Sequence, residues 1–142
     1  MAVGGAPAPA DASKRPALSK DTHKEYLLLL YEDERAWVSM SEAEQGAIFG
    51  RYMEFSKSIT ATGQFIAGEP LAPTMQARSI SLDENKRVVR DGPFAETREQ
   101  LGGYYRVWAK NLDEAVAIAA KIPAAETGTV EVRPVMDTSA YA

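Results

Sequence analysis

The chain of 142 residues contains no cysteine and a single histidine, His23. These absences exclude disulfides, thiolate metal sites, a cysteine nucleophile and any mechanism that needs two histidines. No apolar run approaches the roughly 20 residues of a membrane span, and the apolar core of a secretory signal, about 7–15 residues, is missing. Acidic residues outnumber basic ones by 20 to 16, which argues against a nucleic-acid surface. We therefore expect a cytoplasmic protein that binds neither nucleic acid nor membrane.

The length predicts one domain with a substantial core, and the composition divides the chain into three parts. Residues 1–24 are rich in Ala, Pro and Gly and lack hydrophobic periodicity, which predicts a flexible N-terminal arm. An arm that docks on a partner subunit and a transit peptide are the alternatives. Residues 25–136 are expected to form the domain, and residues 137–142 a C-terminal tail.

Hydrophobic periodicity within the domain predicts two helices separated by strands. Residues 26–31 form a continuous apolar run, typical of a strand that is buried on both faces. A capping box of Ser41 and Glu44 opens a helix expected to reach about Thr62. A short strand at 65–67 precedes a hairpin of residues 76–82 and 87–90, and residues 97–100 suggest one helical turn. A strand at 104–109, a helix from Leu112 that Pro123 stops, and a strand at 129–135 complete the chain.

This order predicts an α+β fold: a ferredoxin-like split β-α-β with both helices on one face of an antiparallel sheet. Two helices on one side cannot cover both faces of the sheet. Yet the first strand is apolar on both faces, and in the strand at 104–109 Tyr104 and Trp108 point to the face opposite to that of Val107. An open face of this kind would leave a large apolar patch in water. A second copy of the same sheet covers it most economically, which predicts a two-fold homodimer.

The run Asp91–Tyr105, DGPFAETREQLGGYY, strongly resembles the signature of the DGPF proteins, a branch of the YCII-related family. Residues 31–37 (YEDERAW), 68–71 (GEPL) and 130–135 (VEVRPV) are also similar to that family, so the resemblance spans about residues 25–136.

The resemblance implies a dimeric α+β barrel, in which two ferredoxin-like subunits place their sheets face to face. Related YCII proteins are proposed to be enzymes that use a His-Asp pair, but the only histidine here lies in the arm, so that pair cannot be carried over. Many DGPF proteins look linked to extracytoplasmic-function sigma factors, which implies a regulatory partner.

Asp91 is the candidate catalytic residue, because it stands at the end of a strand before the rigid Gly92-Pro93 turn. A structural role, accepting backbone amides in that turn, is the alternative. Phe94, Glu96 and Arg98 follow and are candidate ligand-binding residues. Glu96 and Arg98 form either a solvated ion pair worth under about 1 kcal/mol or a small polar cluster that recognises an anionic or hydroxylated ligand.

Arg78 and Arg106 complete the ligand-binding candidates, because each shares a strand face with apolar residues. An arginine there needs a partner, so the alternatives are a dimer-interface salt bridge or snorkelling chain and a carboxylate or phosphate clamp. Residues 32–34 are three consecutive acids, but no second cluster at ligand spacing supports them. We expect no metal and no cofactor.

Three functions are compatible with these residues. We expect a small-ligand-binding or regulatory module with a cleft at the dimeric barrel. The first alternative is a small enzyme that uses Asp91 as acid and base on a small polar substrate, and the second is a purely structural dimer.

Overall fold

The computed structural model describes residues 18–141. Four strands form one antiparallel sheet in the order β2-β5-β1-β6. Their bounds are β1 (Lys24–Glu32), β2 (Phe65–Pro70), β5 (Gln100–Ala109) and β6 (Thr129–Pro134). The central strands β1 and β5 pair along their length, with one irregularity at Leu30/Tyr31. The order is that of a split β-α-β fold, since β5 lies between β1 and β2. The expected antiparallel α+β architecture is confirmed.

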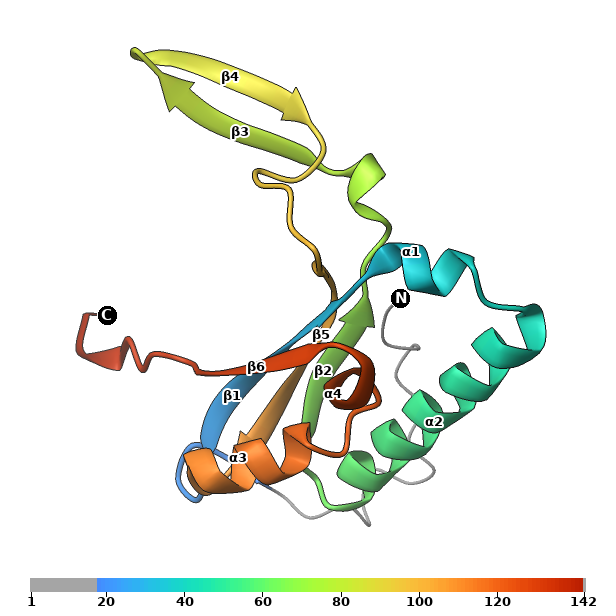
Figure 1. Cartoon of the computed structure of the whole chain (residues 1–142). Helices are drawn as coiled ribbons and strands as arrows, with labels where there is room; N and C mark the ends of the chain where they lie inside the picture. The colour runs from blue at the N-terminus through green and yellow to red at the C-terminus, as the bar shows by residue number, and fades with distance from the viewer. Residues whose placement is uncertain (1–17, 142) are drawn as a thin grey trace.

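In the described part of the chain, four α-helices accompany this sheet: α1 (Glu34–Val38), α2 (Glu42–Ala61), α3 (Leu112–Ala119) and α4 (Ala124–Thr127). The two longer ones, α2 and α3, pack on the same face of the sheet (Figure 1). The expected capping box begins α2: the Ser41 side chain accepts from the Glu44 amide at 3.1 Å, and Glu44 accepts from the Ser41 amide at 3.0 Å. The helix therefore begins where the sequence predicts.

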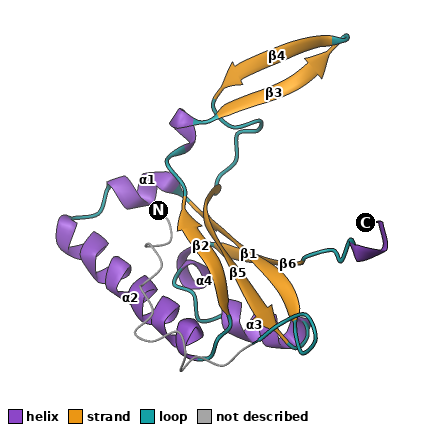
Figure 2. Ribbon diagram, turned by 180° about the vertical axis from the view of Figure 1, so that it is seen from behind, coloured by secondary structure: helices purple, strands orange, loops and turns teal. Residues whose placement is uncertain are grey.

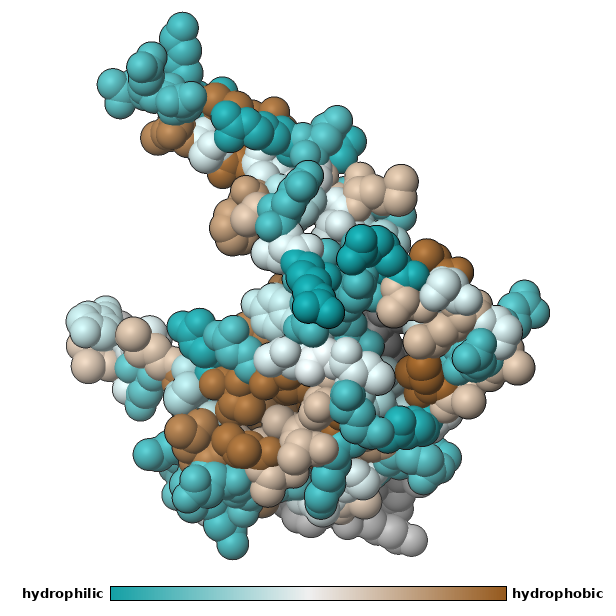
Figure 3. All heavy atoms as spheres, viewed as in Figure 1, coloured by the Kyte–Doolittle hydropathy of each residue, from teal (hydrophilic) through white to brown (hydrophobic). Residues whose placement is uncertain are grey.

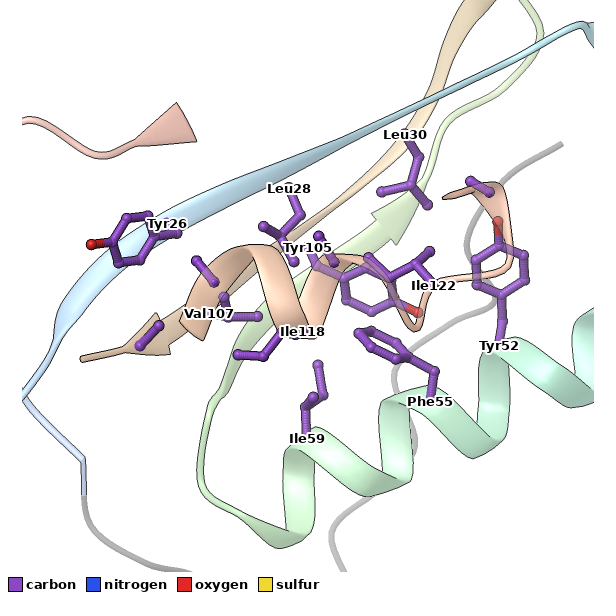
Figure 4. Packing of buried hydrophobic residues seen from close by; sticks show 14 residues of the cluster. Tyr26, Leu28, Leu30, Tyr52, Phe55, Ile59, Tyr105, Val107, Ile118 and Ile122 are labelled. Atoms are coloured by element: carbon purple, nitrogen blue, oxygen red, sulfur yellow. The ribbon is translucent and has the colours of Figure 1, made fainter. Parts of the chain in front are cut away.

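The core lies between the sheet and these helices. Alternate residues of the central strands face it, and Tyr52, Phe55 and Ile59 of α2 point toward them (Figure 4). The strand residues in this core are Tyr26, Leu28, Leu30, Tyr105, Val107 and Ala109. Burial of such a layer is the main stabilising contribution in a domain of this size. The core fixes the register of β1 against β5, and this register places the end of β1 beside the start of β5.

The strands β3 (Arg78–Asp83) and β4 (Lys86–Asp91) form a separate two-stranded sheet. Their turn residues Glu84 and Asn85 have φ values of 48° and 67°, as a tight two-residue hairpin turn requires. The hairpin projects from the body, away from α2 (Figures 1 and 2). We call residues 78–91 the hairpin arm.

Three local features differ from what the sequence predicts. Residues 97–100 form no helical turn; β5 begins at Gln100 and runs through both glycines at 102 and 103. Gln100, Leu101 and Gly103 pair with β1, and the Gly102 carbonyl accepts from the Leu71 amide at 2.9 Å, so long-range partners satisfy the backbone of this segment. The short helix α1 was not predicted. The second long helix ends at Ala119 rather than at Pro123, which instead precedes α4.

Within the described residues, the second face of the main sheet carries no helix. The register places Leu27, Leu29, Tyr104, Arg106 and Trp108 on it, and we call this surface the open sheet face. The apolar side chains among them are half-buried. Over residues 18–141 of the single chain, the sheet does not close into a barrel.

Candidate functional site

Two residues singled out in the sequence meet at the base of the hairpin arm. Arg78 and Asp91 are paired across β3 and β4, and the Arg78 Nε lies 3.0 Å from Asp91 Oδ1. The Asp91 side chain is 87% exposed. General acid-base work near neutral pH needs a carboxyl group that burial or a like charge perturbs, and the single chain does not bury Asp91.

The loop after the hairpin arm carries the next three candidates. Phe94 is 94% exposed, and Glu96 and Arg98 are exposed as well. The pKa of Asp33 is lowered chiefly because Arg35 donates to its carboxylate, and the positive charge of Arg98 adds a smaller effect. Arg98 therefore lies near the start of α1, which the sequence did not indicate.

Arg106 lies on the open sheet face, apart from the hairpin arm. Its Nε donates to Glu25 Oε2 at 2.8 Å, and Nη2 contacts the same oxygen. Arg78 and Arg106 thus each have a carboxylate partner within the chain. Of the six predicted site residues, the single chain brings only Arg78 and Asp91 into contact.

A more enclosed site lies at the end of β1. A cavity of about 260 Å³ opens there between α1, the segment after β2 and the beginning of β5. We call it the α1 pocket. Its lining residues are Glu32, Glu34, Trp37, Val38, Leu71, Pro73, Gln100 and Gly102.

Glu34 anchors one wall of the α1 pocket. Its Oε1 accepts from the Thr74 amide at 2.8 Å and its Oε2 accepts from the Thr74 hydroxyl, also at 2.8 Å. The Glu34 amide donates to Gln100 Oε1 at 2.9 Å, and Gln100 Nε2 donates to the Thr97 carbonyl at 2.7 Å. These bonds tie α1, the segment before the hairpin arm and the loop after it into one frame.

Glu32 joins the α1 pocket to the core. Its Oε1 accepts from the Tyr52 hydroxyl at 3.1 Å, and its Oε2 accepts from the Thr127 hydroxyl at 3.2 Å. Burial, reinforced by the Glu32 charge and hydrogen bond, raises the pKa of Tyr52 far above its ordinary value. Tyr52 therefore stays protonated and serves as a hydrogen-bond donor to the carboxylate.

Trp37 forms the aromatic part of the α1 pocket. It lies on α1, and its ring centroid is 6.3 Å from that of Phe49 on α2, at an interplanar angle of 54°. The Trp37 carbonyl accepts from Gln45 Nε2 at 2.9 Å, which fixes the end of α1 on α2. The ring is half-buried, so it retains a free surface toward the cavity.

The pocket combines two carboxylates and one amide side chain with apolar walls, and no lysine or arginine is among its lining residues. Neutral donors alone contact Glu32 and Glu34 within residues 18–141. Carboxylate oxygens accept hydrogen bonds and attract positive charge, so the arrangement suits a molecule that carries donors or a cation.

A larger hollow, of about 610 Å³, lies between α2 and the segment after α3, where Gly50, Arg51 and Lys121 line it. It is wide open to solvent, so it forms a shallow surface rather than an enclosed site. We do not assign it a ligand.

The sequence had singled out residues of the α1 pocket for other reasons. Glu32 and Glu34 were considered as part of an acidic run, and Trp37 as part of the YEDERAW segment that resembles the family. In the part of the chain that the structure describes, no three acidic or histidine side chains converge on a possible metal position. Leu71 and Gln100 were missed, although both belong to segments that carry the family resemblance.

None of the helices within residues 18–141 is long and apolar enough to cross a bilayer. The single histidine, His23, precedes β1 and lies at the opposite end of that strand from the α1 pocket. The nine residues of β1 span roughly 30 Å at about 3.3 Å per residue. A histidine-dependent reaction in this pocket is therefore excluded within one chain.

The fold and the site define a small α+β protein whose pocket lies at the end of its first strand. Comparison with known families is consistent with that class: the YCII-related domain matches residues 24–139. The chain belongs to the YCII-related family. It is 33% identical over 111 residues to an uncharacterized protein of Rhizobium meliloti (strain 1021), an alignment that covers 77% of this chain and 90% of that protein.

Proposed function

We propose that the protein is a small-ligand-binding module and that its ligand binds in the α1 pocket. One observation carries this proposal. Six of the eight lining residues come from three separate segments, 31–37, 68–71 and 91–105, by which the chain resembles DGPF proteins. Segments far apart in the sequence converge on one cavity, which a purely structural role for each segment does not require.

The lining supports a small ligand with hydrogen-bond donors or a positive charge. The volume of about 260 Å³ lies just below the usual range for drug-sized ligands, roughly 300–1,000 Å³. Trp37 offers an aromatic face on which a cation is stabilised, and Glu32 and Glu34 offer acceptor oxygens. A small amine is therefore a better match than a phosphate or a carboxylate.

We further propose that the protein works as a homodimer of the DGPF branch, with a regulatory role. The open sheet face supports the dimer, because Leu27, Leu29, Tyr104 and Trp108 form an apolar surface that no helix within residues 18–141 covers. Two such faces packed together would give the dimeric barrel, and the Glu25–Arg106 pair would lie within that interface. Binding of a small molecule in each subunit would then be the signal that a protein partner reads.

The two tryptophans allow the pocket and the interface to be observed separately. The variant Trp108→Phe leaves Trp37 as the only tryptophan, and Trp37→Phe leaves Trp108 on the open sheet face. We would titrate each variant with a panel of small primary amines and, as matched controls, the corresponding carboxylates, and record the tryptophan emission.

We expect at least one amine to change the Trp37 emission of Trp108→Phe with saturation, while the emission of Trp37→Phe stays constant. The same amine should lose its effect when Glu34→Gln is added to Trp108→Phe. Equal responses in both tryptophan variants, or a response to carboxylates alone, would contradict binding in the α1 pocket. Dilution of the Trp37→Phe protein should shift the Trp108 emission as the dimer dissociates, and a constant emission would argue against the interface.

A further inference from the structure

The hairpin arm has one apolar and one polar face. Ile80, Leu82 and Val89 lie on the same face, since Ile80 pairs directly with Val89 and Leu82 is two residues further along β3. Their exposed fractions are 61%, 63% and 58%. The other face presents Ser79, Ser81, Asp83, Lys86, Val88 and Arg90. An alternation of this kind is typical of antiparallel strands that pack on a core with one side only.

Within residues 18–141, no part of the chain covers this apolar face. Figures 1 and 2 show the hairpin arm standing clear of the body from both sides. Figure 3 shows hydrophobic residues along the middle of the arm and hydrophilic ones at its tip. An isolated two-stranded hairpin is at best marginally stable in water, so an arm with this pattern needs an apolar surface on which to pack.

Charged residues border the apolar face at both ends. The Arg78–Asp91 pair closes its base at 3.0 Å, and Arg87, opposite Leu82, marks its tip. An apolar centre with a charged rim is the usual composition of a protein interface. The pattern therefore favours a protein as the occupant rather than a lipid or a small ligand.

We propose that a second copy of this chain covers the apolar face of the hairpin arm. Within residues 18–141, a second apolar surface carries no helix, the open sheet face, and the hairpin arm is attached to β2 and β5, two of the strands that form that sheet. Contact with the same partner molecule would thus be continuous with the proposed dimer interface. A two-fold arrangement lets each arm reach the other subunit, so both arms are buried in one assembly.

Charge supports the same occupant. Residues 78–91 contain four basic and three acidic residues, in a chain whose net charge is −4. The arm is therefore positive relative to an acidic body, and the body of a second copy offers the complementary sign. Complementary charge of this kind directs association and orientation.

The absence of cysteine makes the contact directly testable. Leu82→Cys places one reactive thiol on the apolar face of the hairpin arm. Ser81→Cys, one residue earlier, places one on its polar face. Each variant would be labelled with a benzophenone maleimide. It would then be unfolded and refolded together with an isotopically heavy chain that carries the same change, so that heavy and light chains can associate, and the mixture would be irradiated. Peptide mass spectrometry then separates heavy–light links between chains from links within a chain.

We expect heavy–light links from position 82 at least about fivefold more abundant than those from position 81. Links only within one chain, equal links from both positions, or none from position 82 would overturn the proposal. As an independent readout, Ile80→Glu should weaken dimerisation at least tenfold in sedimentation experiments, whereas Ser81→Glu should leave it unchanged. An unchanged dissociation constant for Ile80→Glu, with circular dichroism showing an intact body, would likewise overturn it.

This inference rests on the proposed dimer but not on the proposed ligand. If the wild-type chain sediments as a monomer at the crosslinking concentration, both the dimer and the role of the arm are wrong. If Leu29→Glu dissociates the dimer while position 82 gives no link between chains, the sheet interface stands and the arm proposal alone is wrong. The amine titration of Trp37 tests the pocket separately from either result.

Discussion

Loss of the Glu34 carboxylate should loosen the wall of the α1 pocket and the attachment of the hairpin arm. Glu34 holds Thr74 by two hydrogen bonds of 2.8 Å, one to the amide and one to the hydroxyl. A hydrogen bond to a charged group contributes about 1.5–3 kcal/mol, and less where solvent competes. Both bonds are part-buried, so Glu34→Ala should cost roughly 2 kcal/mol in total.

Glu34→Gln should retain about half of this stabilisation, roughly 1 kcal/mol, because its carbonyl still accepts from the amide. Hydrogen exchange followed by NMR is the assay, since it reports the Thr74 amide itself. At about tenfold per 1.4 kcal/mol, exchange of that amide should accelerate at least tenfold in Glu34→Ala and less in Glu34→Gln. Glu42→Ala, in the first turn of α2, is the control. Unchanged exchange at Thr74 in Glu34→Ala would refute the argument that Glu34 holds this segment.

Further predictions concern the core that positions the pocket. Gly128→Ala should destabilise the fold by about 2–3 kcal/mol in a urea titration, because an added Cβ would lie 2.1 Å from the Tyr31 carbonyl oxygen. Gly46→Ala, in open space on α2, should stabilise the fold by about 0.5–1 kcal/mol in the same assay. Ser56 and Tyr105 share a buried 2.9 Å hydrogen bond, so Ser56→Ala should lower the free energy of unfolding by about 1–3 kcal/mol. The double variant with Tyr105→Phe should lose less than the sum of the two single variants, and strict additivity would contradict this coupling. Burial raises the pKa of Tyr105 to about 12, above its unfolded value of 10.0. The protonated side chain therefore contributes fully to the free energy of unfolding below pH 10. This contribution is lost as the pH rises toward 12, by about 1.4 kcal/mol per pH unit. Tyr105→Phe should reduce the loss of stability in urea between pH 10 and 11. A loss as steep as that of the wild-type protein would contradict the assignment of this pH dependence to Tyr105.

Local sequence patterns predicted those parts of the fold whose structure depends on residues close together in the chain. The Ser41–Glu44 capping box and the apolar spacing of Tyr52, Phe55 and Ile59 are local, and both were confirmed. The start of β5 was missed because Gln100 becomes part of a strand only by pairing with Glu32, 68 residues earlier. Helical propensity over four residues is a weak indicator against such long-range pairing.

The candidate site was predicted less well, for a related reason. The sequence placed weight on charged residues near the DGPF run, and the structure distributes them over the hairpin arm, an exposed loop and the open sheet face. The α1 pocket depends on a convergence that spacing does not reveal, since Glu34, Leu71 and Gln100 meet only once β1, β2 and β5 have assembled. The resemblance to DGPF proteins marked all three segments but contained no information on their proximity.

The proposed function requires that the α1 pocket holds a small molecule in the working protein. Native mass spectrometry of protein purified gently from cells can show this, because one spectrum reports the number of subunits and any retained ligand. We predict a dimer with a constant extra mass that disappears in Trp37→Ala. A wild-type dimer of bare chains, or an extra mass that Trp37→Ala retains in full, would contradict the claim.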